Sequence, residues 1–176
     1  MSAFDLELSS PFPPGTTATP LGGPGQGGHQ SANWYIQYGM DLGADEGTEV
    51  RAAFDGHITV IHPHDPAADS GSVYGAQLFM RAPNDMMGGF YTHMTDVPPE
   101  LAVDSWVSRG DLLGTVFAHG GIPPHLHMAL VEIIGGLPGG RYQGVDLYGL
   151  FLDLTGSDAV ASVTFMQDGN PPSVSV

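Results

Sequence analysis

The chain has 176 residues, of which 26 are glycine, 15 are proline and none is cysteine. Its 19 acidic residues outnumber four basic ones, and the net charge of −15 argues against nucleic acid or an anionic membrane as a partner, because both select positive surfaces. Disulfides, cysteine-type zinc sites and thiol nucleophiles are excluded. No apolar run approaches the roughly 18 residues of a membrane span, so we expect no membrane insertion.

The elements predicted along the chain are short, because turn-forming Gly and Pro recur throughout it. Residues 11–28 are too rich in both for a regular element and are expected to be irregular. Two β-rich runs, Glu49–Phe54 and His57–His62, flank Asp55-Gly56 and predict a hairpin. Further strands are predicted at Tyr74–Arg81, Gly89–Met94, Asp104–Val107, Leu113–Ala118, Leu126–Ile134 and Val160–Met166, and short helices at Pro98–Ala102 and Val145–Leu154.

This pattern predicts one all-β, antiparallel domain, and the length suffices for a substantial core. We expect an irregular Pro/Gly-rich arm at residues 1–28, a core at 29–134, and an extension at 135–176 packed on the same domain. The first residues show neither the positive nor the apolar region of a signal peptide.

An alternating histidine pair, His125-Leu126-His127, lies in an apolar run that is typical of a strand. Successive strand residues point to opposite faces, so both imidazoles project from the same side. Neutral imidazole is the commonest metal ligand in proteins, although an isolated pair of this kind also occurs on ordinary surfaces. The pair is therefore a candidate metal site whose meaning depends on the rest of the chain.

Five blocks of the sequence occur in an order that supports the metal hypothesis: Gly39–Ala44, Gly47–Val60, Phe90–Met94, Val107–Gly114 and Pro124–His127. Together they resemble the zinc endopeptidases of the lysostaphin, LytM and LasA family along residues 29–132. The resemblance implies a single antiparallel β-sheet domain of the duplicated hybrid motif type, with long loops. It also implies zinc-dependent hydrolysis of peptide bonds.

The resemblance also implies roles for individual residues. Asp41 and His127 match zinc ligands of the family, whereas His93 and His125 match residues that lie beside the metal and take part in catalysis. Lysostaphin-type members carry a third ligand, a histidine, four residues before the aspartate, where this chain has Gln37, a poor zinc ligand. LasA-type members carry that histidine about a dozen residues upstream, which corresponds here to His29. We therefore expect His29 to be the third ligand and Gln37 to point away from the metal.

Two imidazoles, one carboxylate and an open position form a catalytic rather than a structural zinc site. Zinc lowers the pKa of its bound water to about 7 and polarises the scissile carbonyl. His93 and His125 are the candidates for general base and for transition-state stabiliser, and the sequence does not distinguish the two roles.

Members of the family usually cut peptidoglycan stems or cross-bridges, often at bonds that involve glycine. The resemblance thus implies a peptide or peptidoglycan substrate and action outside the cytoplasm, through secretion, a periplasmic location, or delivery by a phage or injection apparatus. The charge of −15 works against adhesion to anionic wall polymers.

Two alternatives remain open from the sequence. The same fold with a degenerate site would be a binding or scaffold module. A cupin-like metal enzyme would use His125 and His127 with Glu132, but no histidine follows His127 and His119 stands where that motif needs glycine. The remaining histidines, His57, His62 and His64, are expected on the surface, and His119 in a loop near the site.

Overall fold

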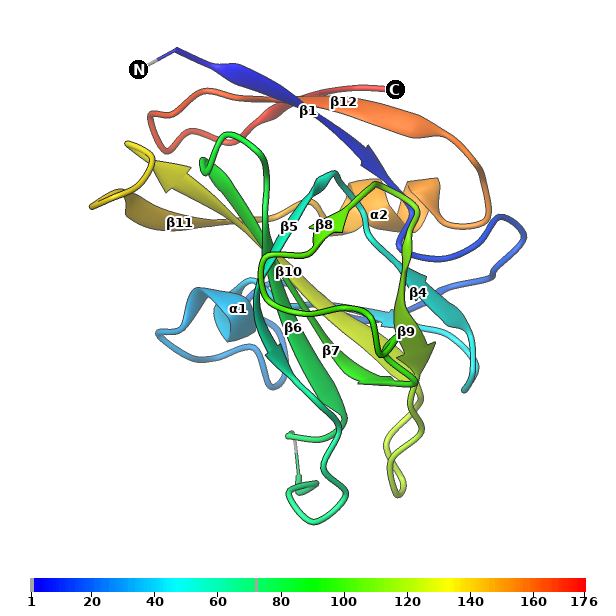
Figure 1. The fold of residues 1–176 in the computed structure, drawn as a ribbon. Helices are drawn as coiled ribbons and strands as arrows, with labels where there is room; N and C mark the ends of the chain where they lie inside the picture. The colour runs from blue at the N-terminus through cyan, green and yellow to red at the C-terminus, as the bar shows by residue number, and fades with distance from the viewer. Residues whose placement is uncertain (1, 72) are drawn as a thin grey trace.

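The computed structural model describes residues 2–71 and 73–176 (Figure 1). These residues form an all-β fold with two short helices, as the sequence predicts, and the strand pairings between named elements are antiparallel. The helices are α1 Trp34–Gln37 and α2 Tyr148–Leu154, and the strands are β1 Phe4–Ser9, β2 Thr19–Gly22, β3 Met40–Gly43, β4 Glu49–Arg51, β5 Gly56–His62, β6 Ala76–Arg81, β7 Met87–Thr95, β8 Trp106–Val107, β9 Leu112–Val116, β10 His125–Ile134, β11 Arg141–Val145, β12 Val160–Phe165 and β13 Ser173–Ser175.

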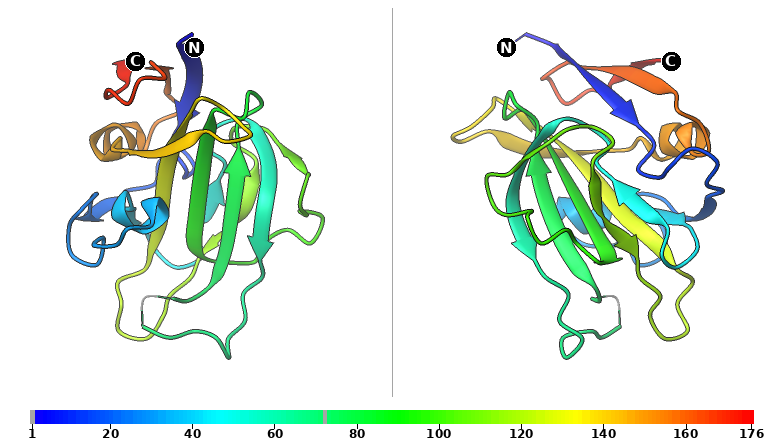
Figure 2. Two further views of the ribbon diagram at one scale, coloured as in Figure 1. Left: turned by 90° about the vertical axis from the view of Figure 1, so that its left-hand side faces the viewer. Right: turned by 45° about the vertical axis from the view of Figure 1, so that its right-hand side comes forward.

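The strands form two sheets. The larger has the order β2-β3-β10-β7-β6-β5-β8, with β9 beside β7 and β4, and β11 beside β10. Figure 2 shows β10, β7, β6 and β5 side by side, with α1 against β10. The smaller sheet, β1-β12-β13, joins the two ends of the chain.

A single apolar core extends across both sheets. Strand β6 alternates between buried and half-buried residues, so Leu78 and Met80 enter the core while Gln77 and Phe79 face the other side. From the second sheet and α2, Phe165 and Phe151 pack into the same core. Complete burial of a side chain of this size contributes about 1.5–3 kcal/mol to folding, so the layer formed by the chain ends is firmly attached to the larger sheet.

Three local predictions differ from the structure, and one helix was missed. The predicted hairpin is wrong, because β4 pairs with β9 while β5 pairs with β6 and β8. The predicted arm at residues 1–28 is not wholly irregular, since β1 pairs with β12, and β2 pairs with β3 at the edge of the larger sheet, where Pro20 is tolerated. Residues 98–102 form a turn and not a helix, and α1 was not predicted.

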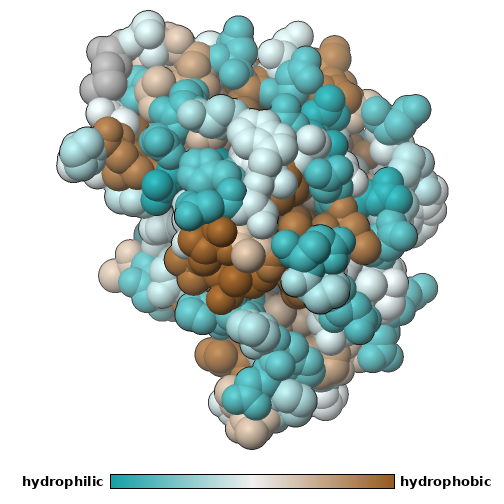
Figure 3. Space-filling model, viewed as in Figure 1, coloured by the Kyte–Doolittle hydropathy of each residue, from teal (hydrophilic) through white to brown (hydrophobic). Residues whose placement is uncertain are grey.

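The surface shown in Figure 3 is mostly hydrophilic, with an apolar patch near its centre. Exposed apolar side chains in the described residues include Val103, Trp106 and Leu112. No helix in the described part of the chain is both long enough and apolar enough to cross a membrane.

Candidate metal centre

Strand pairing brings distant sequence motifs together at one end of the larger sheet. Asp41 on β3 lies opposite His127 on β10 in the antiparallel register. His125 precedes His127 by two residues and lines the same cavity. On the other side of β10, β7 places Thr92 opposite His127, and His93 also lines the cavity because the register of β7 against β6 shifts at this residue, whose φ is positive.

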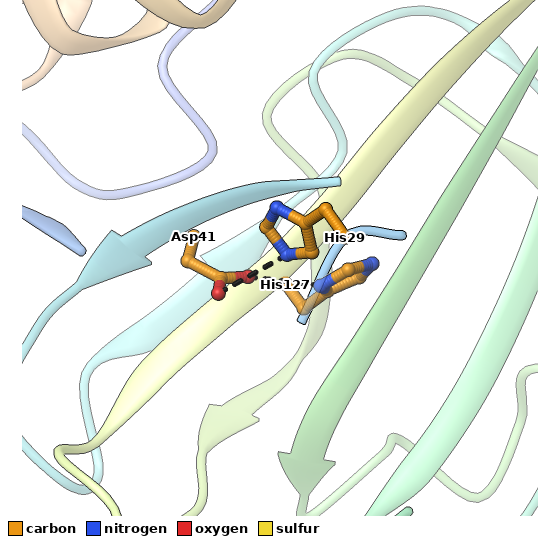
Figure 4. Close-up of side chains that lie close together, drawn as sticks. All are labelled: His29, Asp41 and His127. Atoms are coloured by element: carbon orange, nitrogen blue, oxygen red, sulfur yellow. Dashed lines mark hydrogen bonds and ion pairs between the residues drawn. The ribbon is translucent and has the colours of Figure 1, made fainter. Parts of the chain in front are cut away.

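His29 completes the group from the segment between β2 and α1. Its Nε2 lies 3.2 Å from Asp41 Oδ2, and His127 Nδ1 lies 2.8 Å from Asp41 Oδ1. One potential ligand atom from each of these three residues lies within 4.8 Å of the others (Figure 4). The structure thus brings together the three residues that the sequence predicts as ligands.

The protonation pattern of the four site histidines is set by the backbone. When a ring is neutral, the nitrogen that bonds to a carbonyl oxygen, which accepts only, carries the proton, and the other nitrogen presents a lone pair. These hydrogen bonds run from His29 Nδ1 to Gly23 (2.8 Å), His93 Nδ1 to Tyr74 (3.1 Å), His125 Nδ1 to Pro123 (2.7 Å) and His127 Nε2 to Tyr35 (2.7 Å).

The nitrogens of His29 and His127 that face Asp41 are therefore the ones with lone pairs. A carboxylate and two such nitrogens in close contact are all acceptors, and they are stable together only with a proton or a cation between them. This donor set fits zinc, which binds imidazole nitrogen and carboxylate oxygen. The hydrogen bonds from the ring N–H groups to backbone carbonyl oxygens are of the kind that orient metal-binding histidines.

The electrostatics of the site also favour positive charge. Burial opposes ionisation of Asp41, but hydrogen bonds from His127 and His29 outweigh it and hold the pKa of this carboxyl below its usual range. The hydrogen bond to Asp41 raises the pKa of His29, against the effect of burial. Both shifts indicate that a cation at this point is stabilised by the surrounding groups.

Gly39 leaves the space in which the rings of His29 and His127 lie. A Cβ at this position would overlap the His127 ring and would lie 2.8 Å from His29 Nε2. The glycine that stands two residues before Asp41 is therefore required by the close approach of both imidazoles to β3, and not by its own φ angle.

His93 and His125 lie next to this group. The His93 backbone has φ +66°, and its ring stacks on Tyr74 with centroids 3.8 Å apart. Burial lowers the pKa of His93 to about 3, which keeps the imidazole neutral. His125 Nε2 lies 3.7 Å from Asp41 Oδ1, and the ring centroids of His93 and His125 are 4.9 Å apart.

All five predicted site residues line one cavity of about 390 Å³. Tyr35, Tyr74 and Ile122 contribute to its walls. Gln37 is exposed and is not among the lining residues. The chain therefore brings His29, and not Gln37, to the position beside Asp41.

Other histidines and neighbours of the site were predicted less well. His64 is not a free surface residue, because its Nε2 bonds to Asp69 Oδ2 at 2.7 Å and its side chain is only 17% exposed. His119 stacks on Tyr74 at a centroid distance of 4.7 Å. Tyr74 and Gln77 also line the cavity, and no sequence signal marks them, since they lie near the start of an ordinary strand pattern.

The cupin-like arrangement is not assembled. Glu132 lies an odd number of residues from His127 along β10 and hence on the opposite face of the strand. Its buried Oε1 accepts hydrogen bonds from the backbone and side-chain nitrogens of Gln167. Among the described residues, the single group of three or more potential metal ligands is His29, Asp41 and His127.

Solved structures with a similar fold include peptidases from several bacteria. The antimicrobial peptidase lysostaphin from Staphylococcus simulans is 17% identical, with a TM-score of 0.53, over 82% of this chain and 52% of that chain. A zinc-containing peptidase from Vibrio cholerae is 18% identical with a TM-score of 0.52, over 80% and 39% respectively. A mutant of the catalytic domain of the prophage-encoded M23 protein EnpA from Enterococcus faecalis is 20% identical with a TM-score of 0.50, over 77% and 92%.

This chain thus spans about half the length of lysostaphin, and about two fifths of the Vibrio protein. No curated protein sequence matches it. The sequence profile of Peptidase family M23 matches residues 35–138, more than half of the chain, and this range includes Asp41, His93, His125 and His127. His29 lies upstream of the matched range. The chain belongs to Peptidase family M23.

Proposed function

We propose that this protein is a zinc-dependent endopeptidase with His29, Asp41 and His127 as the zinc ligands. The observation that carries the proposal is the convergence of two imidazole lone pairs on the Asp41 carboxylate, with each ring fixed by a backbone carbonyl. Three protein ligands leave a coordination position for water, which is the arrangement of catalytic zinc sites. When bound, zinc would polarise the scissile carbonyl and lower the pKa of the attacking water.

The two other histidines are proposed as the groups that move protons. Each donates its Nδ1 proton to a backbone carbonyl, so the lone pair of each neutral ring lies on Nε2. One of them would take the proton of the attacking water, and one would stabilise the developing oxyanion or protonate the leaving amine. The Tyr74 ring stacks on one face of the His93 ring and would hold that imidazole in place during these steps.

The proposed substrate is a peptide of peptidoglycan, in a stem or cross-bridge, cleaved at a bond that involves glycine, with the protein acting outside the cytoplasm. Side chains such as Tyr35, Tyr74 and Ile122 enclose a cavity of about 390 Å³, which favours residues with little or no side chain beside the scissile bond. The fold similarity to the antimicrobial peptidase lysostaphin and to a prophage-encoded protein supports a substrate of this class.

The test combines metal analysis with cleavage of pentaglycine and of purified peptidoglycan. The wild-type protein should hold one zinc ion per chain and hydrolyse at least one of these substrates. His29→Ala should lose zinc and activity, because only two protein ligands remain. Gln37→Ala is the matched control and should retain both, since Gln37 is exposed.

The outcomes separate the open alternatives. Zinc and activity that survive in His29→Ala but not in Gln37→Ala would overturn the ligand assignment. Wild-type protein that holds zinc but cleaves neither substrate nor a wider peptide set would favour the binding or scaffold module. Wild-type protein that holds no zinc would remove the basis for the peptidase.

A further inference from the structure

A tyrosine from the C-terminal extension contacts the backbone of the candidate metal centre. The hydroxyl of Tyr148, in the first turn of α2, donates to the carbonyl oxygen of Asp41 at 3.0 Å. The same hydroxyl accepts the backbone N–H of Gly22 at 3.1 Å. Gly22 is the register partner of Asp41 where β2 meets β3. One side-chain oxygen therefore joins both strands at the residue that presents the carboxylate.

The same ring also supports the segment that orients His29. The backbone at Gly23 lies flat against it, since a Cβ on Gly23 would lie 2.7 Å from Tyr148 Cδ1. The carbonyl of Gly23 accepts the hydrogen bond from His29 Nδ1. Tyr148 thus contacts the backbone of Asp41 directly, and it contacts Gly23, which bonds to His29. Two of the three proposed ligands are therefore linked to this tyrosine.

The position of Tyr148 is itself well defined. Phe151 and Leu154, on the same helix, are buried in the core, and they fix α2 against the sheet. The helix is followed by β12, which pairs with β1. The hydroxyl is therefore presented by a packed element and not by a free loop.

We propose that Tyr148 is a positioning residue for the metal centre, and that it makes residues 135–176 part of the zinc site. The inference rests on the proposed function. By holding β2 against β3 and supporting Gly23, the tyrosine sets the separation of the His29 and Asp41 donor atoms. Residues that orient ligands in this way typically change metal affinity by about 10–100-fold when they are altered.

The decisive variant is Tyr148→Phe, which removes the hydroxyl and retains the ring. We expect zinc affinity, measured by competition with a chromophoric chelator, to fall about 10-fold or more. The visible absorption spectrum of the cobalt-substituted protein should also change, because the donor geometry shifts. Tyr142→Phe is the matched control, since that tyrosine belongs to the same extension, lies on β11 and is 46% exposed.

Thermal melting of the metal-free variants separates positioning from simple support of the fold. A purely structural tyrosine would lower the melting temperature in Tyr148→Phe but leave the zinc affinity and the cobalt spectrum of the folded protein unchanged, and this result would overturn the proposal. Gly23→Ala supplies a second test, because its Cβ would push the segment off the ring while the hydroxyl remains. It should weaken zinc binding as well. A wild-type protein without zinc affinity would instead contradict the proposed function.

Discussion

The side chains at the two ends of the cavity are positioned in different ways. At the metal end, Asp41 and His127 are register partners on neighbouring strands, so the sheet itself sets their separation. At the end proposed for proton transfer, His93 has a positive φ of +66°, and its ring is supported by the stacked Tyr74. A left-handed backbone at a non-glycine residue costs free energy, which the surrounding structure must offset.

This difference predicts that metal binding and turnover are separable in the proposed site. The metal end depends on hydrogen-bonded strands that cannot shift without breaking the ladder, whereas the other end depends on one backbone conformation and one ring stack. Changes at the first end should therefore remove the metal, and changes at the second should leave the metal in place and slow the reaction. Three experiments test this division and a fourth tests the effect of the net charge, and they follow in order of expected effect.

The largest effect is expected for Asp41→Ala and His127→Ala. Each removes one of three proposed ligands, so zinc affinity should fall by more than the roughly 100-fold upper range seen when ligand-orienting groups are removed. Zinc content after dialysis measures this, and activity should fall with it. Asp45→Ala, at an exposed aspartate just beyond β3, should behave as wild type. Full zinc occupancy in both ligand variants would show that the metal end is assigned incorrectly.

His93→Ala and His125→Ala should keep stoichiometric zinc and lose about 10²–10⁴-fold in kcat, as expected for positioned proton-transfer groups. Metal analysis and steady-state kinetics on the same preparations measure the two properties separately. His62→Ala, at an exposed histidine of β5, is the control. If His93→Ala retains wild-type kcat, that residue has no part in the reaction and the division of the cavity fails at this end.

Gly39→Ala breaks the metal end without removing a ligand. Its Cβ would overlap the His127 ring and crowd His29 Nε2, so we expect zinc affinity to fall about 10–100-fold, as for other changes that displace ligands. Chelator competition measures the change. Gly120→Ala should have no effect, because nothing lies within 4 Å of its added Cβ. If the zinc affinity of Gly39→Ala is unchanged, β3 and the two imidazoles can move apart to admit the added methyl group more easily than we infer.

The smallest effect concerns the whole molecule and serves to sharpen the comparison. The net charge of −15 should slow approach to anionic wall polymers, and raising the salt concentration to about 0.1 M or more shortens the Debye length to about 10 Å or less. Cleavage of intact cell walls should therefore speed up a few-fold with salt. Cleavage of pentaglycine, which carries no net charge at neutral pH, should not change in this way. If salt changes the cleavage rates of both substrates equally, it acts on the site itself and not on the approach of the protein to the wall.

The parts of the site that sequence predicts are those carried by ordered motifs. Asp41, His93, His125 and His127 lie in blocks that form β3, β7 and β10, and β10 pairs with both of the other strands, so their meeting at one cavity follows from strand pairing. The expected position of His29 depends on a spacing of twelve residues, and the structure places it beside Asp41. Their roles as ligands and proton carriers stay predictions until a metal is measured.

The rest could not be predicted, because it depends on contacts between segments far apart in the chain. The turn at Asp55-Gly56 is a favoured hairpin signal, yet β4 takes β9 as its partner, and no local pattern records that choice. Tyr148 acts through a hydroxyl on a backbone carbonyl, which leaves no trace in residue spacing. Tyr74 supports His93 by stacking on its ring, and a single aromatic residue in a sequence does not indicate which side chain it will stack on.

The pairing of β1 with β12 has a consequence for the order in which the protein folds. Phe4 lies opposite Phe165, so nearly the whole chain must be present before this sheet can close. Contacts between residues so distant in sequence are slow to form, because the entropy of closing a long loop must be overcome first. Since α2 lies just before β12, the support that Tyr148 gives to the site also arrives late. During synthesis, a nascent chain would therefore close this smaller sheet only after the segments that carry Asp41 and His127 have emerged.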